Sequence, residues 1–247
     1  MIGPRLILLL LLCLIPTISF AQFDLLDTLK EKTTEQLGSS SGKALGNDRI
    51  ISGLKEALSI GTDNTINLTG NLNGYLKNDA IKILLPKQLQ AMDKGLRVVG
   101  MGPQVDEFVV GMNRAAEEAA PLAKPIFQDA VKEMSVEDGK AILHGGDTAA
   151  TDYFKGKTKD KLTEAFTPKV QEAMDKVGVA AQYKELVGRY TALPFVKAEQ
   201  FDLDQYVVGK SLNGLFYTLA QEEQKIRTDP AARVTELLKD VFGKQGN

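Results

Sequence analysis

The polar residues with the clearest spacing for chemistry lie along one predicted helix that starts near Val105. Asp106, Asn113 and Glu117 are separated by seven and four positions, so a helix places all three along one edge of its apolar face. Carboxylate and amide oxygens in such a row could bind a hard cation, and two carboxylates could work as an acid and base pair. A helix supplies only one side of a metal site and no EF-hand loop is present, so we expect no metal and no cofactor.

This polar row also has a structural interpretation. Polar side chains at the edge of a helix-packing face are usually hydrogen-bonded to neighbouring loops or helix ends. We therefore take Asp106, Asn113 and Glu117, with the neighbouring Arg114, as candidate binding residues only if a cleft reaches them. Burial with internal hydrogen bonds would favour the structural role.

A second candidate site surrounds His144, the only histidine of the chain. It precedes Gly145 and Gly146, and we predict that the next helix starts at Asp147 or Thr148. The two glycines free the backbone to turn amide groups toward a ligand, and a helix N-terminus favours anions. Asp147 as a capping residue would occupy the same donors, so an anion site and a simple helix cap both remain open.

Charged residues also gather at the junction of the last two predicted helices. Glu223 and Arg227 have the i,i+4 order that favours an ion pair on a helix, and Glu222 and Arg233 lie nearby. We interpret this cluster as solvated or as stabilising the junction. The G-x-S-x-G match at residues 38–42 lies in a Gly/Ser-rich stretch and not in a strand-to-helix turn, so nothing indicates a serine hydrolase of the α/β type.

The elements that position these residues are predicted to be helices. The helix from residue 105 has a continuous apolar stripe typical of a core-packed helix, made of Val105, Phe108, Val109, Met112, Ala115, Ala116 and Ala119. Similar patterns elsewhere predict an all-α, single-domain bundle of about nine helices. Helical periodicity fails near residues 70–86, where we predict a short extended segment or hairpin that ends at Pro86, the start of the next helix. Pro168 predicts a kink or a new start in the helix of residues 158–177.

The N-terminus has the features of a secretory signal peptide. Arg5 precedes an apolar run over residues 6–14, and small residues at Ser19 and Ala21 predict cleavage after Ala21. The run is shorter than the roughly 20 residues of a membrane span, so we expect no transmembrane anchor in the mature chain. Residues 22–47 are predicted to form an N-terminal helix and a Gly/Ser linker, and residues 48–247 the helical domain.

Composition narrows the compartment and the partners. Cys13 is the only cysteine and lies in the signal peptide, so the mature chain can form no disulfide. A leader without disulfides favours the periplasm of a Gram-negative bacterium, or secretion. The net charge of −2 becomes −3 once Arg5 is removed, so we expect no nucleic acid as partner. An envelope protein or a small ligand is the expected partner, and the sequence sets no oligomeric state.

Several short stretches resemble the bacterial family catalogued as domain of unknown function 4197. The most specific is Met112-Asn113-Arg114-Ala115-Ala116-Glu117, and others include Gly53–Leu58, Gly74-Tyr75, Ile81–Ile83, Leu85-Pro86, Ile126-Phe127, Ala149–Thr151, Leu215-Phe216, Glu222-Glu223, Ile226-Arg227, Asp229-Pro230 and Val241–Gly243. The resemblance spans nearly the whole mature chain. It implies a secreted, single-domain helical protein of Gram-negative bacteria without an established activity, and it brings no catalytic residues.

The favoured function is therefore a binding or interaction module, with its site in a cleft beside Asp106, Asn113 and Glu117. The alternative is a hydrolase-like enzyme that uses Asp106 or Glu117 with His144 or Arg114. It requires these side chains to lie together and to reach solvent. A third hypothesis is association through the N-terminal helix of residues 23–37.

Overall fold

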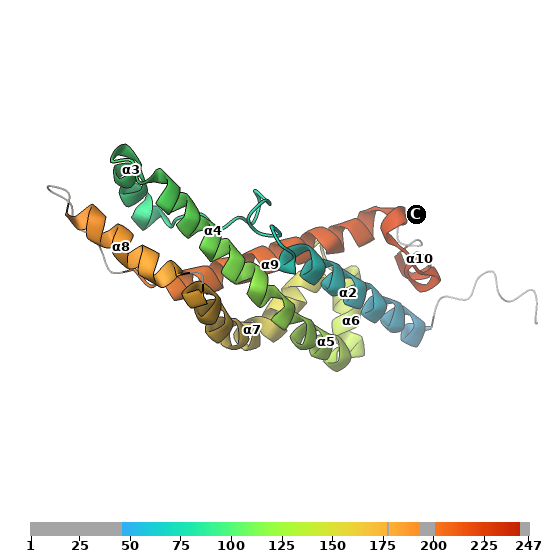
Figure 1. Cartoon of the computed structure of the whole chain (residues 1–247). Helices are drawn as coiled ribbons and strands as arrows, with labels where there is room; N and C mark the ends of the chain where they lie inside the picture. Colours follow the sequence, from blue (N-terminus) through green and yellow to red (C-terminus); the bar gives the residue numbers. More distant parts are fainter. Residues whose placement is uncertain (1–45, 177, 193–200, 243–247) are drawn as a thin grey trace, which may run out of the picture. The chain divides into compact units, whose positions relative to one another are not determined.

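The computed structural model describes residues 46–176, 178–192 and 201–242, which fold into packed helices (Figure 1). The predicted helix at residues 23–37 and the leader lie outside the described residues. The α-helices are α2 (Asn47–Gly70), α3 (Gln90–Val98), α4 (Gly102–Ala119), α5 (Ala123–Glu133), α6 (Val136–His144), α7 (Ala149–Lys176), α8 (Val179–Thr191), α9 (Leu203–Thr228) and α10 (Glu236–Phe242). Three short 3-10 helices are η1 (Lys87–Leu89), η2 (Ala120–Leu122) and η3 (Pro230–Ala232).

The described residues contain no strand, which confirms the all-α class. Of the two forms predicted near residues 70–86, the short extended segment is present and the hairpin is wrong, because these residues form turns followed by an extended stretch without a partner strand. The helix predicted at Pro86 also starts differently, since Pro86 caps the 3-10 helix η1 and α3 begins only at Gln90.

Some helix boundaries differ from those predicted from the sequence. Residues 149–176 form the single helix α7, which passes through Pro168 without ending. The new start predicted at Pro168 is therefore wrong. Proline removes one backbone donor and crowds the preceding turn, but packing outweighs that cost here. Phe154, Leu162, Phe166 and Val170 on this helix are fully buried or nearly so.

Helix α4 is the packing element that the sequence predicts. Six of its seven stripe residues are fully buried, and only Val109 keeps partial exposure. Burying a side chain such as Phe108 stabilises the fold by about 1.5–3 kcal/mol. The helix contacts α2, α3, α7, α8 and α9, and in Figure 1 it runs as a green diagonal across the bundle.

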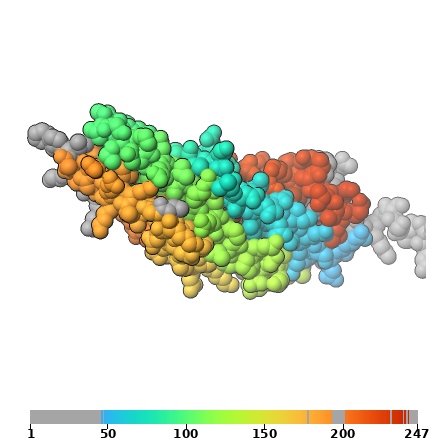
Figure 2. Space-filling model, in the orientation of Figure 1, coloured from blue at the N-terminus to red at the C-terminus, as the bar shows by residue number. Residues whose placement is uncertain are grey.

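A second centre of packing joins α5, α7 and α9. The ring centroids of Phe127 and Phe154 lie 5.1 Å apart in an edge arrangement, and those of Phe127 and Phe216 lie 6.2 Å apart. Aromatic pairs at such distances add about 0.5–1.5 kcal/mol beyond their buried area. The segment of residues 71–86 lies against α4 and α9. In Figure 2 it is the teal surface between the green of α4 and the red of the C-terminal helices.

Candidate functional site

The side chain of Asn113 holds the extended stretch of residues 81–85 against α4. Its Oδ1 accepts a hydrogen bond of 2.8 Å from the Ile83 amide, and its Nδ2 donates to the Ile83 carbonyl, also at 2.8 Å. The same amide group donates to the carbonyl of Val109 at 2.8 Å. Asn113 is fully buried and Ile83 is 1% exposed, so this amide gives a lone extended residue the two bonds that a partner strand would give.

Glu117 holds the preceding turn in a similar way. Its Oε1 accepts from the amides of Tyr75 and Leu76, each at 3.0 Å, and its Oε2 accepts from Arg114. Arg114 also donates to Oδ1 of Asn73 at 2.9 Å. The Glu117 side chain is 4% exposed, so both of its oxygens are occupied and withdrawn from solvent.

Tyr75 links this turn to α9. Its hydroxyl donates to the Ser211 carbonyl at 2.6 Å, and its ring is fully buried. Burial raises the pKa of Tyr75 well above its usual range, and the negative charge of Glu117 raises it further. The hydroxyl therefore remains a proton donor throughout the physiological pH range.

Asp106 does not share the environment of Asn113 and Glu117. Its side chain is 65% exposed and pairs with Arg97 of α3 at 2.6 Å. Arg97 also pairs with Asp93 at 2.6 Å. The hydrogen bond from Arg97 holds the pKa of Asp106 below its ordinary value. The expected common row along one edge of the apolar face is therefore wrong for Asp106, which faces solvent and the neighbouring helix, whereas Asn113 and Glu117 are buried.

His144 and Thr148, the candidates of the second predicted site, each contact a residue four positions away in the sequence. His144 is exposed at the end of α6, with Nδ1 2.9 Å from the carbonyl of Lys140. Thr148 precedes α7 and its hydroxyl donates to Asp152 at 3.2 Å. The amides of the first turn of α7 are instead bound by Glu223, which comes from α9.

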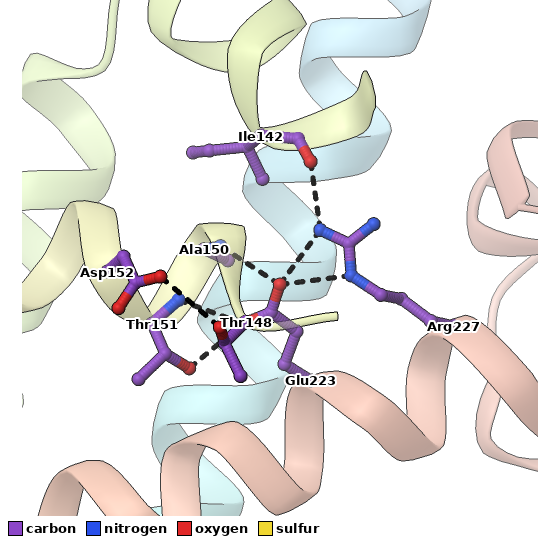
Figure 3. A network of polar contacts seen from close by, with 7 residues as sticks. All are labelled: Ile142, Thr148, Ala150, Thr151, Asp152, Glu223 and Arg227. Carbon is purple, nitrogen blue, oxygen red and sulfur yellow. Dashed lines mark hydrogen bonds and ion pairs between the residues drawn. The ribbon is translucent and has the colours of Figure 1, made fainter. Parts of the chain in front are cut away.

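Glu223 occupies the place that the sequence suggested for an anion (Figure 3). Its carboxylate accepts from the amides of Ala150 and Thr151 at 2.9 and 2.8 Å, and from the Thr151 hydroxyl at 2.9 Å. Arg227 donates to it at 3.0 and 2.8 Å, and reaches the Ile142 carbonyl at 2.8 Å. A buried charge is stable only when it is paired and hydrogen-bonded, and this carboxylate is both.

The cavity beside Glu223 and Arg227 is too small for a ligand. It is lined mainly by apolar residues of α2, α7 and α9, and it has a volume of about 20 Å³. Roughly 10–15 Å³ of such space is needed for one water molecule. The i,i+4 spacing of Glu223 and Arg227 predicted an ion pair, but nothing local to it indicated that the pair caps a helix more than 70 residues earlier.

A larger groove lies where the extended stretch meets the start of α9. We call it the lysine groove, and it has a volume of about 440 Å³. Its lining consists of Lys82, Leu84, Leu85, Pro86, Lys87, Gln88, Gln90, Phe201, Tyr206 and Lys210. Ligand sites typically measure about 300–1,000 Å³, so this groove has room for a small molecule.

Aromatic contacts shape one wall of the lysine groove. The Tyr206 hydroxyl donates to the Leu84 carbonyl at 2.7 Å, which fixes the extended stretch to α9. The rings of Phe201 and Tyr206 meet edge to face at 5.4 Å. The ammonium group of Lys210 lies 5.6 Å from the centre of the Tyr206 ring, within the range of a cation–π contact. Partial burial raises the pKa of Tyr206, which keeps its hydroxyl a donor.

The predicted polar row does not line this groove, although Asn113 positions one of its walls. Asn113 bonds both backbone groups of Ile83, and the flanking residues Lys82 and Leu84 line the groove. The alternation of side chains along residues 81–85 indicated which of them face the core and which face the groove. Ile81 and Ile83 are buried, whereas Leu84 is 58% exposed.

Within the ranges that the structure describes, no group of three or more histidine, cysteine, aspartate or glutamate residues could hold a metal ion. None of the helices in those ranges combines the length and the apolar character needed to cross a bilayer.

Comparison with known proteins gives a family. No curated protein and no solved structure matches the chain. One family model, described as protein of unknown function (DUF4197), matches residues 44–243. That match covers α2 to α10 and includes every residue of the lysine groove and of the Asn113 and Glu117 contacts. The chain therefore belongs to the DUF4197 family.

Proposed function

We propose that this protein is a non-catalytic binding protein of the Gram-negative envelope, and that the lysine groove is its ligand site. The leader-like N-terminus with cleavage after Ala21 supports export to the periplasm. The observation that supports binding is the groove itself. It combines exposed apolar surface, an aromatic wall and polar groups in one concave site of ligand size.

The internal contacts of the polar row favour binding over hydrolysis. A general acid or base must reach its substrate within hydrogen-bonding distance. Both oxygens of Glu117 are bonded to the protein and its side chain is 4% exposed, whereas Asp106 is exposed and bound to Arg97. These residues therefore support an architectural role, in which Asn113 and Glu117 hold the segment that carries the groove.

Ligand binding can be tested with amphiphiles that share an octyl chain and differ in head group. Octyl phosphate, octanoate, octylamine and octanol are titrated into residues 22–247 and binding is followed by calorimetry. We expect at least one of them to bind, and Leu84→Ser to weaken that binding. Leu84 is 58% exposed, so its replacement removes groove surface without opening the core.

The matched control is Leu72→Ser, because Leu72 is also an exposed leucine, at 74%, and lies outside the groove lining. It should leave binding unchanged. Equal binding by wild type and Leu84→Ser for every head group would refute the groove as the site. Export is tested separately by sequencing the N-terminus of the protein from the periplasmic fraction, where Gln22 is expected as the first residue. A first residue of Met1 would refute it.

A further inference from the structure

The charges of the lysine groove define the ligand more closely. Three lysines line it, Lys82, Lys87 and Lys210, and among the described lining residues there is no carboxylate. None of the three forms an ion pair within 4.0 Å in the part of the chain that the structure describes. The positive charge of Lys82 acts on Asp106, whose ion-pair partner is Arg97.

The groove concentrates positive charge on a protein whose net charge is −2. Six of the fourteen lysines described elsewhere on the helices have a carboxylate within 4.0 Å, for example Lys124 with Asp63 and Lys176 with Glu172. The groove differs in that it brings three lysines without such a partner among the described residues to one concave site. Three ammonium groups around one concavity repel each other and attract an anion. A ligand with more than one negative charge would neutralise them.

The donor chemistry favours phosphate over carboxylate. The cationic groups among the described lining residues are all lysines. Lysine acts as a compact point charge and is a common phosphate ligand. A phosphate monoester carries a charge of about −1.5 to −2 at neutral pH and offers three acceptor oxygens. The amides of Gln88 and Gln90 add neutral donors.

The other half of the lining is apolar. Leu84, Leu85, Pro86 and the rings of Phe201 and Tyr206 lie in the same groove as the lysines. Lys210 is held above the Tyr206 ring, so the charged and aromatic parts of the site adjoin one another. A free inorganic ion would leave this apolar surface in water, whereas an amphiphile would cover it.

We infer that the lysine groove binds a phosphate monoester attached to an apolar group. This inference rests on the proposed function and specifies its ligand class. The phosphate lies among Lys82, Lys87 and Lys210, and the apolar group lies against Leu84, Pro86 and the Phe201–Tyr206 pair. Such a ligand can come from two sources, a soluble phosphorylated metabolite or the head group of an anionic lipid.

The test compares octyl phosphate with octanol and with inorganic phosphate by calorimetry, using residues 22–247. Octyl phosphate is expected to bind more tightly than either, because it alone uses both halves of the groove. The double variant Lys82→Gln/Lys210→Gln should weaken its binding about tenfold or more, since hydrogen bonds to charged groups contribute that much or more each. Raising the salt concentration should weaken binding further.

Lys161→Gln is the matched control. Lys161 is an exposed lysine of α7 outside the groove lining, and its replacement changes the net charge of the protein by the same amount per residue. It should leave the affinity for octyl phosphate unchanged. Melting curves by circular dichroism confirm that the variants fold, which is expected because Lys87 and Lys210 are exposed and Lys82 is partly so.

Vesicles separate the two sources of the ligand. Co-sedimentation with phosphatidylcholine vesicles that contain phosphatidic acid, but not with phosphatidylcholine alone, supports the inference with a lipid ligand. Binding of octyl phosphate without vesicle binding supports it with a soluble ligand.

Two results would overturn the inference. If octanol, octylamine or octanoate binds as tightly as octyl phosphate and Leu84→Ser weakens that binding, the groove is a ligand site but its ligand is not a phosphate monoester. If no octyl compound binds in a manner that depends on Leu84, the inference and the proposed function both fail.

Discussion

Replacing Asn113 with alanine removes the two hydrogen bonds that hold Ile83, and this makes it the most informative perturbation of the fold. The Ile83 amide and carbonyl each lose a bond of 2.8 Å, while Ile83 itself is 1% exposed. The Val109 carbonyl is affected less, because it is also a normal acceptor within helix α4. Two buried polar groups are therefore left without a partner.

Each unsatisfied buried group costs about 1–3 kcal/mol, so Asn113→Ala should lower the free energy of unfolding by about 2–6 kcal/mol. That is a large part of the 5–15 kcal/mol of a typical domain. The assay is urea denaturation followed by circular dichroism, with the slope of the transition checked for constancy. Loss of protection of the Ile83 amide from hydrogen exchange should accompany the loss of stability.

Two further variants separate hydrogen bonding from loss of volume. Asn113→Leu fills the space without restoring either bond, so it should recover less than half of the lost stability. Asn78→Ala removes an exposed asparagine of the same segment, which accepts a single bond of 3.2 Å from Ala80, and should cost under about 0.5 kcal/mol. A loss of less than about 1 kcal/mol in Asn113→Ala, or full recovery in Asn113→Leu, would refute the anchoring role.

Three further predictions concern other contacts. Gly214→Ala would place Cβ 2.5 Å from the Tyr75 ring and should lower the free energy of unfolding by about 1–3 kcal/mol. In the control Gly209→Ala, the added Cβ meets no atom within 4 Å, so this variant should be neutral or stabilising. Equal effects of the two variants in thermal melting would contradict this prediction. Glu223→Ala leaves the amides of Ala150 and Thr151 without their acceptor and should lower the free energy of unfolding in urea by about 2–4 kcal/mol. The control Glu236→Ala, at an exposed glutamate, should change it by almost nothing. A loss below about 1 kcal/mol in Glu223→Ala would count against the capping role. Asp138 accepts from the amide and hydroxyl of Ser135, which lower its pKa, so its contribution to stability is present above the unfolded pKa of about 3.9 and is lost as the pH falls through the lower folded value. Ser135→Ala should raise the Asp138 pKa in an NMR titration, and an unchanged value would contradict the assignment.

The helical class and the central role of α4 could be predicted because they depend on local periodicity. The stripe from Val105 to Ala119 identifies a buried face without any knowledge of its neighbours. The capping box of Ser135 and Asp138 has the same local character, since both residues belong to one turn. In each case the signal lies within a few residues of its structural result.

The candidate site could not be predicted, because its parts come from distant segments. Lys82 and Lys210 are far apart in the sequence and line one groove only after α4 and α9 have fixed residues 81–85. Asn113 and Glu117 were correctly singled out as unusual polar residues at the edge of a packing face. Their partners are backbone groups of a turn and an extended stretch, and backbone groups have no sequence signature.

The cap of α7 has a consequence for the order of folding. The first turn of α6 is capped by Ser135 and Asp138, which are three positions apart. The first turn of α7 is capped by Glu223, which lies 72 positions beyond Thr151. The start of α7 is therefore completed only when α9 docks, which makes it a non-local contact with a high cost in loop closure. Protection of the Ala150 and Thr151 amides from hydrogen exchange would report the joining of these two helices as one cooperative unit, while α6 can form its first turn alone.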